Sequence, residues 1–139
     1  FRVRLLDCQY HDVDSSELAF KIAGSLAYKD AMERAGATLL EPVMKVEIHT
    51  NEEFMGDIMS DLSHRRGRPQ GMDVRNGVQI VQAQVPMAEM LNYAPALRAM
   101  TQGRSSFLME YSHYEEVPRL VQDKLVADAR KKVHEEHEA

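Results

Sequence analysis

The order of predicted elements between residues 41 and 115 constrains this chain more than any other feature. Alternating apolar and polar residues, typical of strands with one buried face, occur at 43–50, 78–85 and 105–114, and "MDV" at 72–74 adds a short strand. Two stretches with apolar residues at helical spacing lie between them. The order is strand, helix, strand, strand, helix, strand, which is the split β-α-β, or ferredoxin-like, plan. We therefore predict an α+β fold with a four-stranded antiparallel sheet and two helices on one face.

Turn and cap residues support this order. Asn76 and Gly77 tolerate positive φ and predict a tight hairpin between the second and third strands. Thr50 is expected to cap the next helix, with Glu53 closing a capping box. The second helical stretch should break near Pro95, which suits the first turn of a new helix. Many activities use this plan, so the fold alone assigns no function.

Residues 1–40 contain fewer elements. "RVRLL" at 2–6 alternates apolar and charged side chains and predicts a half-buried strand. A helix should begin near Asp14, where Glu17 would complete a capping box, and should end at Gly36. One strand and one helix bury too little apolar surface for a core. We expect this segment to be the end of a domain that begins upstream, with the apolar face of its helix partly exposed.

The chain is therefore expected to have three parts. Residues 1–40 would be the C-terminal part of one domain, 41–118 a ferredoxin-like domain, and 119–139 a last helix, opened by Pro118, with a charged tail. The sequence begins with Phe1 rather than Met, and we interpret it as the interior of a longer protein.

Charge and cysteine content limit the classes of function. The formal net charge of -5 over 139 residues argues against a surface that is basic throughout, although a local basic patch is compatible with it. Cys8 is the only cysteine, so an intrachain disulfide is impossible and a reducing, cytoplasmic location is expected. No run of about 18 apolar residues is present, so we expect no membrane span.

The sequence contains no complete motif for catalysis or metal binding. The phosphate loop G-x-x-x-x-G-K-[ST] does not occur, so no nucleotide hydrolysis is expected in this part. Cys8 with His11, or His134 with His137, could begin a zinc site, but neither pair has a second pair at suitable spacing. The serines near His11 are assigned to helix capping rather than nucleophilic catalysis. We predict no catalytic residue and no metal site.

A polar turn before the first helix carries the first candidate binding residues. It contains Tyr10, His11, Asp12 and Asp14. A histidine between acids can be a binding contact. The more ordinary arrangement is a loop histidine that hydrogen-bonds a neighbouring aspartate, and the pattern of residues does not decide between them.

The second candidate is the arginine turn, which we define as Arg65, Arg66 and Arg68. Contact with phosphate groups would explain three cations in a glycine-punctuated turn. Helix capping with ordinary solvated charge explains them equally well. Readout of RNA through the sheet is not expected, because the two central strands carry no aromatic residue on which bases could stack.

Several long stretches resemble one family. "YHDVDSSELAFKIAGSLAYKDA" is similar to the end of the fourth domain of bacterial elongation factor G, a translational GTPase. "LLEPVMKVEIHTNEEFMGDIMSDLSHRRG" resembles its passage into domain five, and "VPMAEMLNYAPALRAMTQGR" and "FLMEYSHYEEVP" resemble the second half of domain five. The resemblance covers residues 1 to about 118. It departs from the family at Pro95 and in the loop at 68–76.

The resemblance implies a role in protein synthesis. The parent protein would bind GTP and Mg on an absent N-terminal domain and drive tRNA and mRNA through the ribosome. This part would need no cofactor and would not be an enzyme itself. Its first 40 residues would end a domain of the ribosomal protein S5 domain 2-like fold.

The resemblance also implies partners for both candidate sites. The turn with His11 would lie at the tip of domain four, near tRNA and mRNA in the decoding centre, with Tyr10, Asp12 and Asp14 shaping its loop. Domain five would sit at the large-subunit stalk base, which favours the arginine turn as an rRNA contact. Through these two regions the protein would contact both 16S and 23S rRNA.

Two rival functions stay open. A ribosomal protection factor of the tetracycline-resistance type shares the domain plan and releases a drug instead of driving translocation. A stand-alone ferredoxin-like domain could instead sense a small ligand.

Overall fold

The computed structural model describes the backbone of residues 1–138 and the side chains of residues 1–133. The chain forms two compact units, Phe1–Thr38 and Leu39–Ala139.

The first unit contains one regular element, helix α1 (Glu17–Ala35). The strand predicted at 2–6 is wrong, because residues 1–11 adopt no regular secondary structure. A strand is held by hydrogen bonds to neighbouring extended backbone. The described residues of this unit provide no second strand to pair with.

Helix α1 begins later than predicted. Its N-cap is Ser16, whose Oγ accepts a hydrogen bond from the backbone N–H of Ala19 at 3.1 Å. Glu17 is therefore the first helical residue, too early to close a capping box, and it pairs instead with Lys21 at 3.0 Å. The predicted end is confirmed, since Gly36 caps the helix with a φ of 68°.

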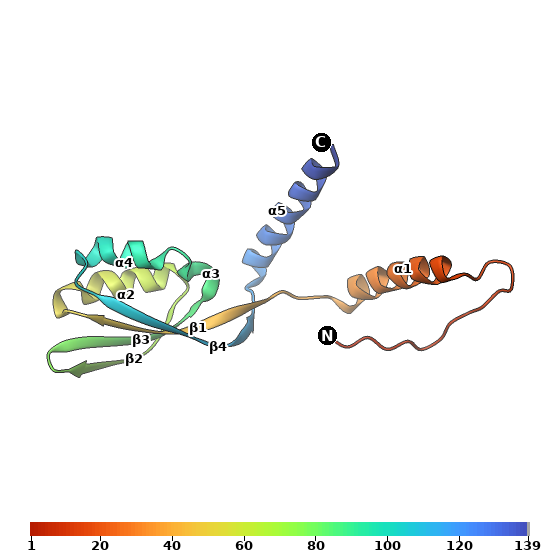
Figure 1. Cartoon of the computed structure of the whole chain (residues 1–139). Coiled ribbons are helices and arrows are strands. Elements are labelled where there is room, and N and C mark those ends of the chain that lie inside the picture. The colour runs from red at the N-terminus through yellow and green to blue at the C-terminus, as the bar shows by residue number, and fades with distance from the viewer. Residues whose placement is uncertain (139) are drawn as a thin grey trace. The chain divides into compact units, whose positions relative to one another are not determined.

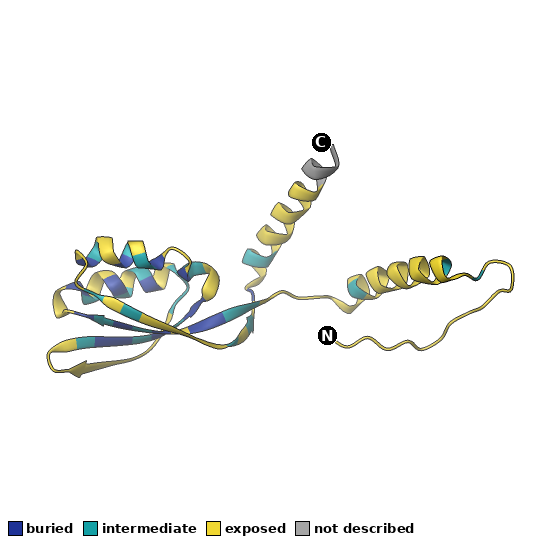
Figure 2. Ribbon diagram, viewed as in Figure 1, coloured by how far each residue is buried: buried dark blue, intermediate teal, exposed yellow. Residues whose placement is uncertain are grey.

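The apolar stripe of α1 is exposed, as expected. None of the helix's residues is buried, and Leu18, Ile22 and Leu26 expose 67%, 54% and 62% of their surface. Figure 2 shows the helix almost entirely in the colour of exposed residues.

The second unit has the predicted ferredoxin-like order (Figure 1). Its elements are β1 (Leu40–Thr50), the short 3-10 helix η1 (Glu52–Phe54), α2 (Met55–His64), β2 (Arg68–Arg75), β3 (Val78–Pro86), α3 (Met87–Met90), α4 (Tyr93–Thr101), β4 (Ser106–Glu116) and α5 (Arg119–Glu138). The strands form one antiparallel sheet in the order β2-β3-β1-β4. Helices α2 and α4 cover one face of it. The predicted α+β architecture is confirmed.

The core lies between this sheet and helices α2 and α4. Strand β1 alternates as predicted, with Met44, Val46 and Ile48 buried, and their neighbours on β3 are Val85, Ala83 and Val81. The predicted helical stripe is buried as well, with Phe54 at the end of η1 and Ile58 and Leu62 on α2. Burial of these side chains supplies most of the stabilisation of a domain this small.

The predicted hairpin is confirmed, but the predicted cap is wrong. Asn76 and Gly77 have φ values of 51° and 81°, which is the primed turn that matches strand twist. Thr50 does not cap η1, whose N-cap is Asn51. Instead, Oγ1 of the buried Thr50 lies 2.7 Å from Ser105 Oγ. This hydrogen bond connects the end of β1 to the residue before β4.

The helix break predicted near Pro95 occurs slightly earlier, between Met90 and Tyr93. Pro95 follows as the third residue of α4, where a backbone N–H would have no partner inside the helix. At the other end, Gln102 and Gly103 both take positive φ and end α4 before β4.

Tyr93 provides a test of this core. It is fully buried, its ring packs edge-on against Phe107 at 5.0 Å, and Arg65 lies over the ring at 5.1 Å. Its hydroxyl has no hydrogen-bond partner among the described residues, and burial raises the pKa of Tyr93.

We expect Tyr93→Phe to leave the free energy of unfolding unchanged or to raise it by up to about 1 kcal/mol, because it removes a desolvated, unpaired hydroxyl. The neighbouring Leu97→Ala should lower it by about 2–5 kcal/mol through loss of packing. Urea denaturation of both variants checks this. A loss with Tyr93→Phe comparable to that of Leu97→Ala would show that the hydroxyl is hydrogen-bonded.

Candidate functional site

The polar turn before α1 is closed by hydrogen bonds within a few residues. The backbone N–H of Ser15 donates to the carbonyl of His11 at 3.0 Å, and the N–H of His11 donates to Ser15 Oγ at 2.9 Å. Ser16 then caps α1, so the turn leads directly into the helix. Two consecutive serines therefore have separate roles, one closing the turn and the other starting the helix.

The candidate side chains of this turn all face solvent. Tyr10, His11, Asp12 and Asp14 are exposed. The ring of Tyr10 stacks on Phe20 of the first helical turns, with centroids 6.3 Å apart and planes 13° from parallel. Among the described residues, no hydrogen bond or ion pair holds the His11 imidazole, so the ordinary arrangement of a histidine bonded to a neighbouring aspartate is not formed.

The arginine turn follows from the way α2 ends. The N–H of Gly67 donates to the carbonyl of Leu62 at 2.7 Å, and the N–H of Arg66 donates to that of Ser63 at 3.3 Å, the pair of bonds of a Schellman motif. A Cβ on Gly67 would lie 2.7 Å from that Leu62 oxygen, so only glycine fits there. Arg66 consequently occupies the left-handed position, with a φ of 57°.

Arg65 and Arg66 are held by partners inside the domain. Arg65 donates to Asp61 Oδ2 at 2.7 Å and to the carbonyl of Glu89 at 2.6 Å. Arg66 donates to both oxygens of Glu41, at 2.6 and 3.0 Å, and to Glu89 Oε1 at 3.2 Å. The carboxylates of Glu41 and Glu89 raise the pKa of Arg66. Arg65 thus connects the end of α2 to α3, and Arg66 connects it to both α3 and β1.

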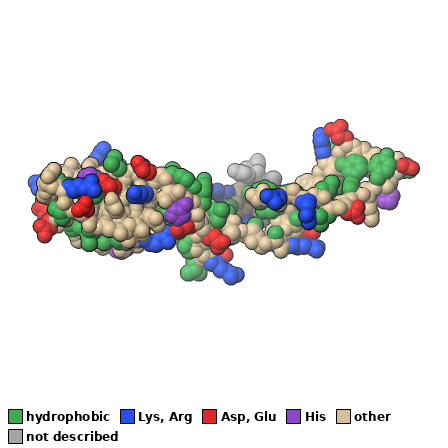
Figure 3. Space-filling view, turned by 90° about the horizontal axis from the view of Figure 1, so that it is seen from below, with side chains coloured by type: hydrophobic (Ala, Val, Ile, Leu, Met, Phe, Trp, Pro, Cys, Tyr) green, Lys and Arg blue, Asp and Glu red, His purple; other side chains and the backbone are tan. Residues whose placement is uncertain are grey.

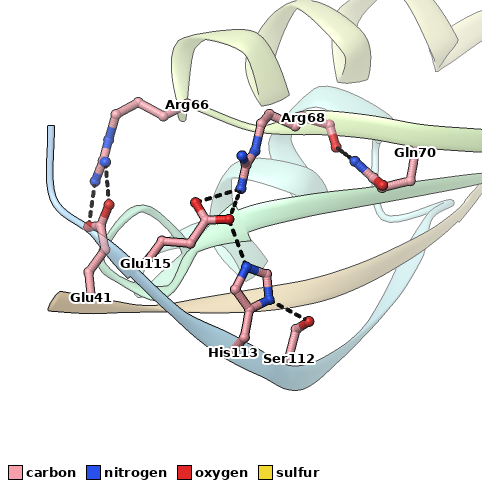
Figure 4. A network of polar contacts seen from close by, with 7 residues as sticks. All are labelled: Glu41, Arg66, Arg68, Gln70, Ser112, His113 and Glu115. Carbon is pink, nitrogen blue, oxygen red and sulfur yellow. Dashed lines mark hydrogen bonds and ion pairs between the residues drawn. The ribbon is translucent and has the colours of Figure 1, made fainter.

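Arg68 belongs to a more open network (Figure 4). Its Nη2 lies 2.6 and 2.7 Å from the two oxygens of Glu115. The imidazole Nε2 of His113 lies 2.7 Å from Glu115 Oε1, and its Nδ1 lies 2.8 Å from Ser112 Oγ. Arg68 is the most accessible member of the turn, with 54% of its side chain exposed against 19% for Arg65 and 26% for Arg66.

A bulge in β4 makes this network possible. Met44 of β1 pairs with Tyr111 and Val43 with His113, which leaves Ser112 as an extra residue. The extra residue changes the alternation of side chains along the strand. Ser112 and His113 can therefore meet, although neighbouring residues of a regular strand point to opposite faces.

The acidic partners of Arg66 and Arg68 are themselves neighbours. Glu41 of β1 is directly opposite Glu115 of β4. Like charges opposite each other destabilise a strand pair. Each carboxylate instead has its own arginine, so the arginine turn neutralises this pair of acids.

The face of the sheet opposite α2 and α4 carries charges of both signs. Viewed from that side, basic and acidic groups are intermixed (Figure 3). Glu47 lies 2.7 Å from His49 and accepts a hydrogen bond from Gln82 at 3.3 Å, and these contacts, that of His49 first, lower the pKa of Glu47. The central strands are β1 and β3, as predicted, and neither supplies an aromatic platform for bases.

The described part of the chain shows no group of three or more metal-ligating side chains. The side chains of His134 and His137 lie outside the described residues. Cys8 is exposed and unpaired with another cysteine. No helix within the described residues is long and apolar enough to cross a membrane.

Two family models match this chain in succession. Residues 1–36 match the model described as elongation factor G, domain IV, and residues 38–125 match the model described as elongation factor G C-terminus. The chain belongs to the elongation factor G family. The resemblance found in the sequence is thereby confirmed.

A solved structure of a protein from Thermus thermophilus is similar to this chain. The two are 43% identical, with a TM-score of 0.71, and the match covers 88% of this chain. It covers 18% of the Thermus protein, so this chain spans less than a fifth of the length of that relative.

Sequence reasoning missed the acidic residues that hold the arginine turn. Glu41, Glu89 and Glu115 lie 23 to 47 positions from their arginines. The strand register places Glu41 and Glu115, and helix α3 places Glu89. The one available signal was that Glu41 and Glu115 would oppose each other once β1 and β4 were paired.

We expect Arg66→Ala to lower the free energy of unfolding by about 1–3 kcal/mol, because it leaves the carboxylate of Glu41, whose side chain is 13% exposed, without its main partner. Arg68→Ala, the matched control, breaks an exposed pair and should cost no more than about 1 kcal/mol. Thermal and urea denaturation measure both. Equal losses would contradict the distinction between a structural Arg66 and an open Arg68.

The Arg68–Glu115 pair should also make stability depend on pH. Arg68, and then His113, lower the pKa of Glu115 from its ordinary value of 4.5. A lowered pKa means that the folded state binds this proton less readily than the unfolded state. The stabilisation that Glu115 contributes to the folded state is therefore complete above about pH 4.5. It is lost as the pH falls through the lowered pKa.

We expect the melting temperature of the wild-type protein to exceed that of Glu115→Gln at neutral pH. This difference in melting temperature should shrink as the pH falls below 4.5. Melting temperatures of both proteins between neutral and acid pH check this. A difference that stays constant across the series would show that the carboxylate's charge is not the stabilising feature.

Proposed function

We propose that this chain is the ribosome-binding C-terminal portion of a translational GTPase of the elongation factor G type. The longer protein would promote GTP-dependent translocation of tRNA and mRNA, in the cytoplasm. GTP and Mg would be bound by parts of that protein other than this chain. The two consecutive family matches support this proposal, since they follow one another in the order of domain IV and the C-terminal domain.

The observation that carries the proposal is the structure of the turn that contains His11. Its backbone is closed by two hydrogen bonds to Ser15 and continues into a capped helix, while the imidazole has no partner among the described residues. A preorganised loop with an uncommitted side chain suits a contact group, because little conformational entropy is lost on binding. We propose that this turn touches tRNA and mRNA in the decoding centre on 16S rRNA.

The second unit would contact 23S rRNA near the stalk base of the large subunit. Of the arginine turn, Arg68 is the residue with an accessible guanidinium, whereas Arg65 and Arg66 are engaged inside the domain. The sheet face is a poor RNA platform, because it presents acids among its cations. The rRNA contact is therefore assigned to loops and helix ends.

His11→Ala in the full-length protein should slow translocation at least about tenfold, the effect of about 1.4 kcal/mol on the barrier. Ribosome-stimulated GTP hydrolysis should stay near the wild-type rate, because GTP is proposed to bind to other parts of the full-length protein. Single-turnover mRNA movement and phosphate release measure the two steps.

Lys29→Ala, which removes an exposed side chain of the same unit on α1, is the matched control and should leave both rates unchanged. Normal translocation by His11→Ala would refute the proposed contact. Equal loss of both rates would point to a folding defect, which circular dichroism would detect.

A further inference from the structure

The ion pair between Arg68 and Glu115 differs from the other contacts of the arginine turn. Glu115 bonds only Nη2 of the guanidinium, and no hydrogen bond of Nε or Nη1 is found among the described residues. Both partners are accessible, with 54% of the Arg68 side chain and 37% of the Glu115 side chain exposed. Such a pair contributes little to stability, so breaking it costs little.

Space for a ligand exists beside this pair. A pocket of about 190 Å³ lies here, lined by Arg66 and Arg68, the prolines Pro86 and Pro118, and three acids, Glu41, Glu115 and Glu116. Arg68 and Glu115 at its wall are both accessible, so a group on a large partner could enter it. Arg66 and Arg68 both line it, but the guanidinium of Arg66 is hydrogen-bonded to Glu41.

Glu115 can leave Arg68 without losing all its partners. Its Oε1 also accepts a hydrogen bond from His113 Nε2 at 2.7 Å, and His113 is fixed by Ser112 at 2.8 Å. A carboxylate abandoned by its only cation would be destabilised, whereas this one keeps a donor. Its neighbour across the strand pair, Glu41, stays neutralised by Arg66.

We propose that Arg68 is a masked phosphate-binding residue, in which Glu115 occupies the place of an RNA phosphate and is displaced by it on binding. A phosphodiester offers two oxygens to the flat guanidinium, as a carboxylate does. Binding of an RNA phosphate also releases counterions from the RNA, which favours binding. Pairing with the internal carboxylate of Glu115 releases none from RNA. This inference rests on the proposed function, because the family assignment is what makes RNA the expected source of phosphate.

The same strand carries a matched control pair. Arg75 lies 3.0 Å from Asp73, and their side chains are 67% and 54% exposed. This pair is at the hairpin end of β2, whereas Arg68 begins the strand. Asp73→Asn removes the same charge as Glu115→Gln and also frees an arginine, but away from the proposed site.

The test measures binding of the 139-residue chain to 70S ribosomes by co-sedimentation over a series of salt concentrations. The variants are Glu115→Gln, Arg68→Ala, the two combined, and Asp73→Asn. Glu115→Gln should tighten binding by up to about fivefold at low salt, the factor that about 1 kcal/mol of released ion pairing provides. A gain in affinity cannot arise from unfolding.

The remaining variants decide whether the gain belongs to Arg68. It should disappear when Arg68→Ala is added, and Arg68→Ala alone should weaken binding less than it does beside Glu115→Gln. The slope of log affinity against log salt should be similar in the wild type and Glu115→Gln, and shallower by about 0.7–0.9 in Arg68→Ala, as expected for the loss of one phosphate contact. An equal gain with Asp73→Asn would overturn the proposal, because the effect would then be general charge.

Two further outcomes would also overturn it. A salt slope that Arg68→Ala leaves unchanged would assign the partner of Arg68 to a ribosomal protein. Measurable binding of labelled inorganic phosphate to Glu115→Gln without ribosomes would assign the site to a free anion. Failure of the wild-type chain to bind ribosomes would instead refute the proposed function, so the two failures are distinguishable.

Discussion

The close contact between Gly67 and the end of α2 determines the geometry around the arginine turn. The Gly67 N–H reaches the Leu62 carbonyl at 2.7 Å, and a side chain on Gly67 would collide with that oxygen. The chain can reverse there only if the preceding residue is left-handed, which costs a non-glycine residue roughly 1 kcal/mol. Arg66 is that residue, and its three contacts to Glu41 and Glu89 offset the cost.

This geometry also explains why a run of cations in the sequence is not a basic patch in the fold. Arg65 bonds residues of α2 and α3, and Arg66 bonds residues of β1 and α3. Arg68 bonds Glu115 at the end of β4. Two acids that face each other across β1 and β4 would repel, and the arginines neutralise them one by one. An arginine cluster can therefore be needed for strand pairing, and only the part that stays accessible is free to serve binding.

The sequence predicted the elements of the second unit well, because strand and helix periodicities are repeated over many residues. The failures were at single positions. Thr50 has the right chemistry for a cap, but the pairing of β1 with β4 gives its hydroxyl to Ser105. Asp14 does not cap α1 because it lies within the turn that His11 and Ser15 close, and the helix begins after that turn with Ser16 as its cap. The strand predicted at 2–6 is absent because alternation of apolar and charged residues does not by itself provide a second strand to pair with.

The two candidate sites could be predicted to different extents for a physical reason. The turn with His11 is built from contacts between residues 10 and 20, so its shape is a local property, and its polar residues and nearby helix start were visible in the sequence. The network around Arg68 joins residues 47 positions apart through a bulge and a strand register. Local sites of the first kind keep their geometry with little help from a core. Sites of the second kind exist only when the sheet has formed, which couples binding at Arg68 to the pairing of β1 with β4.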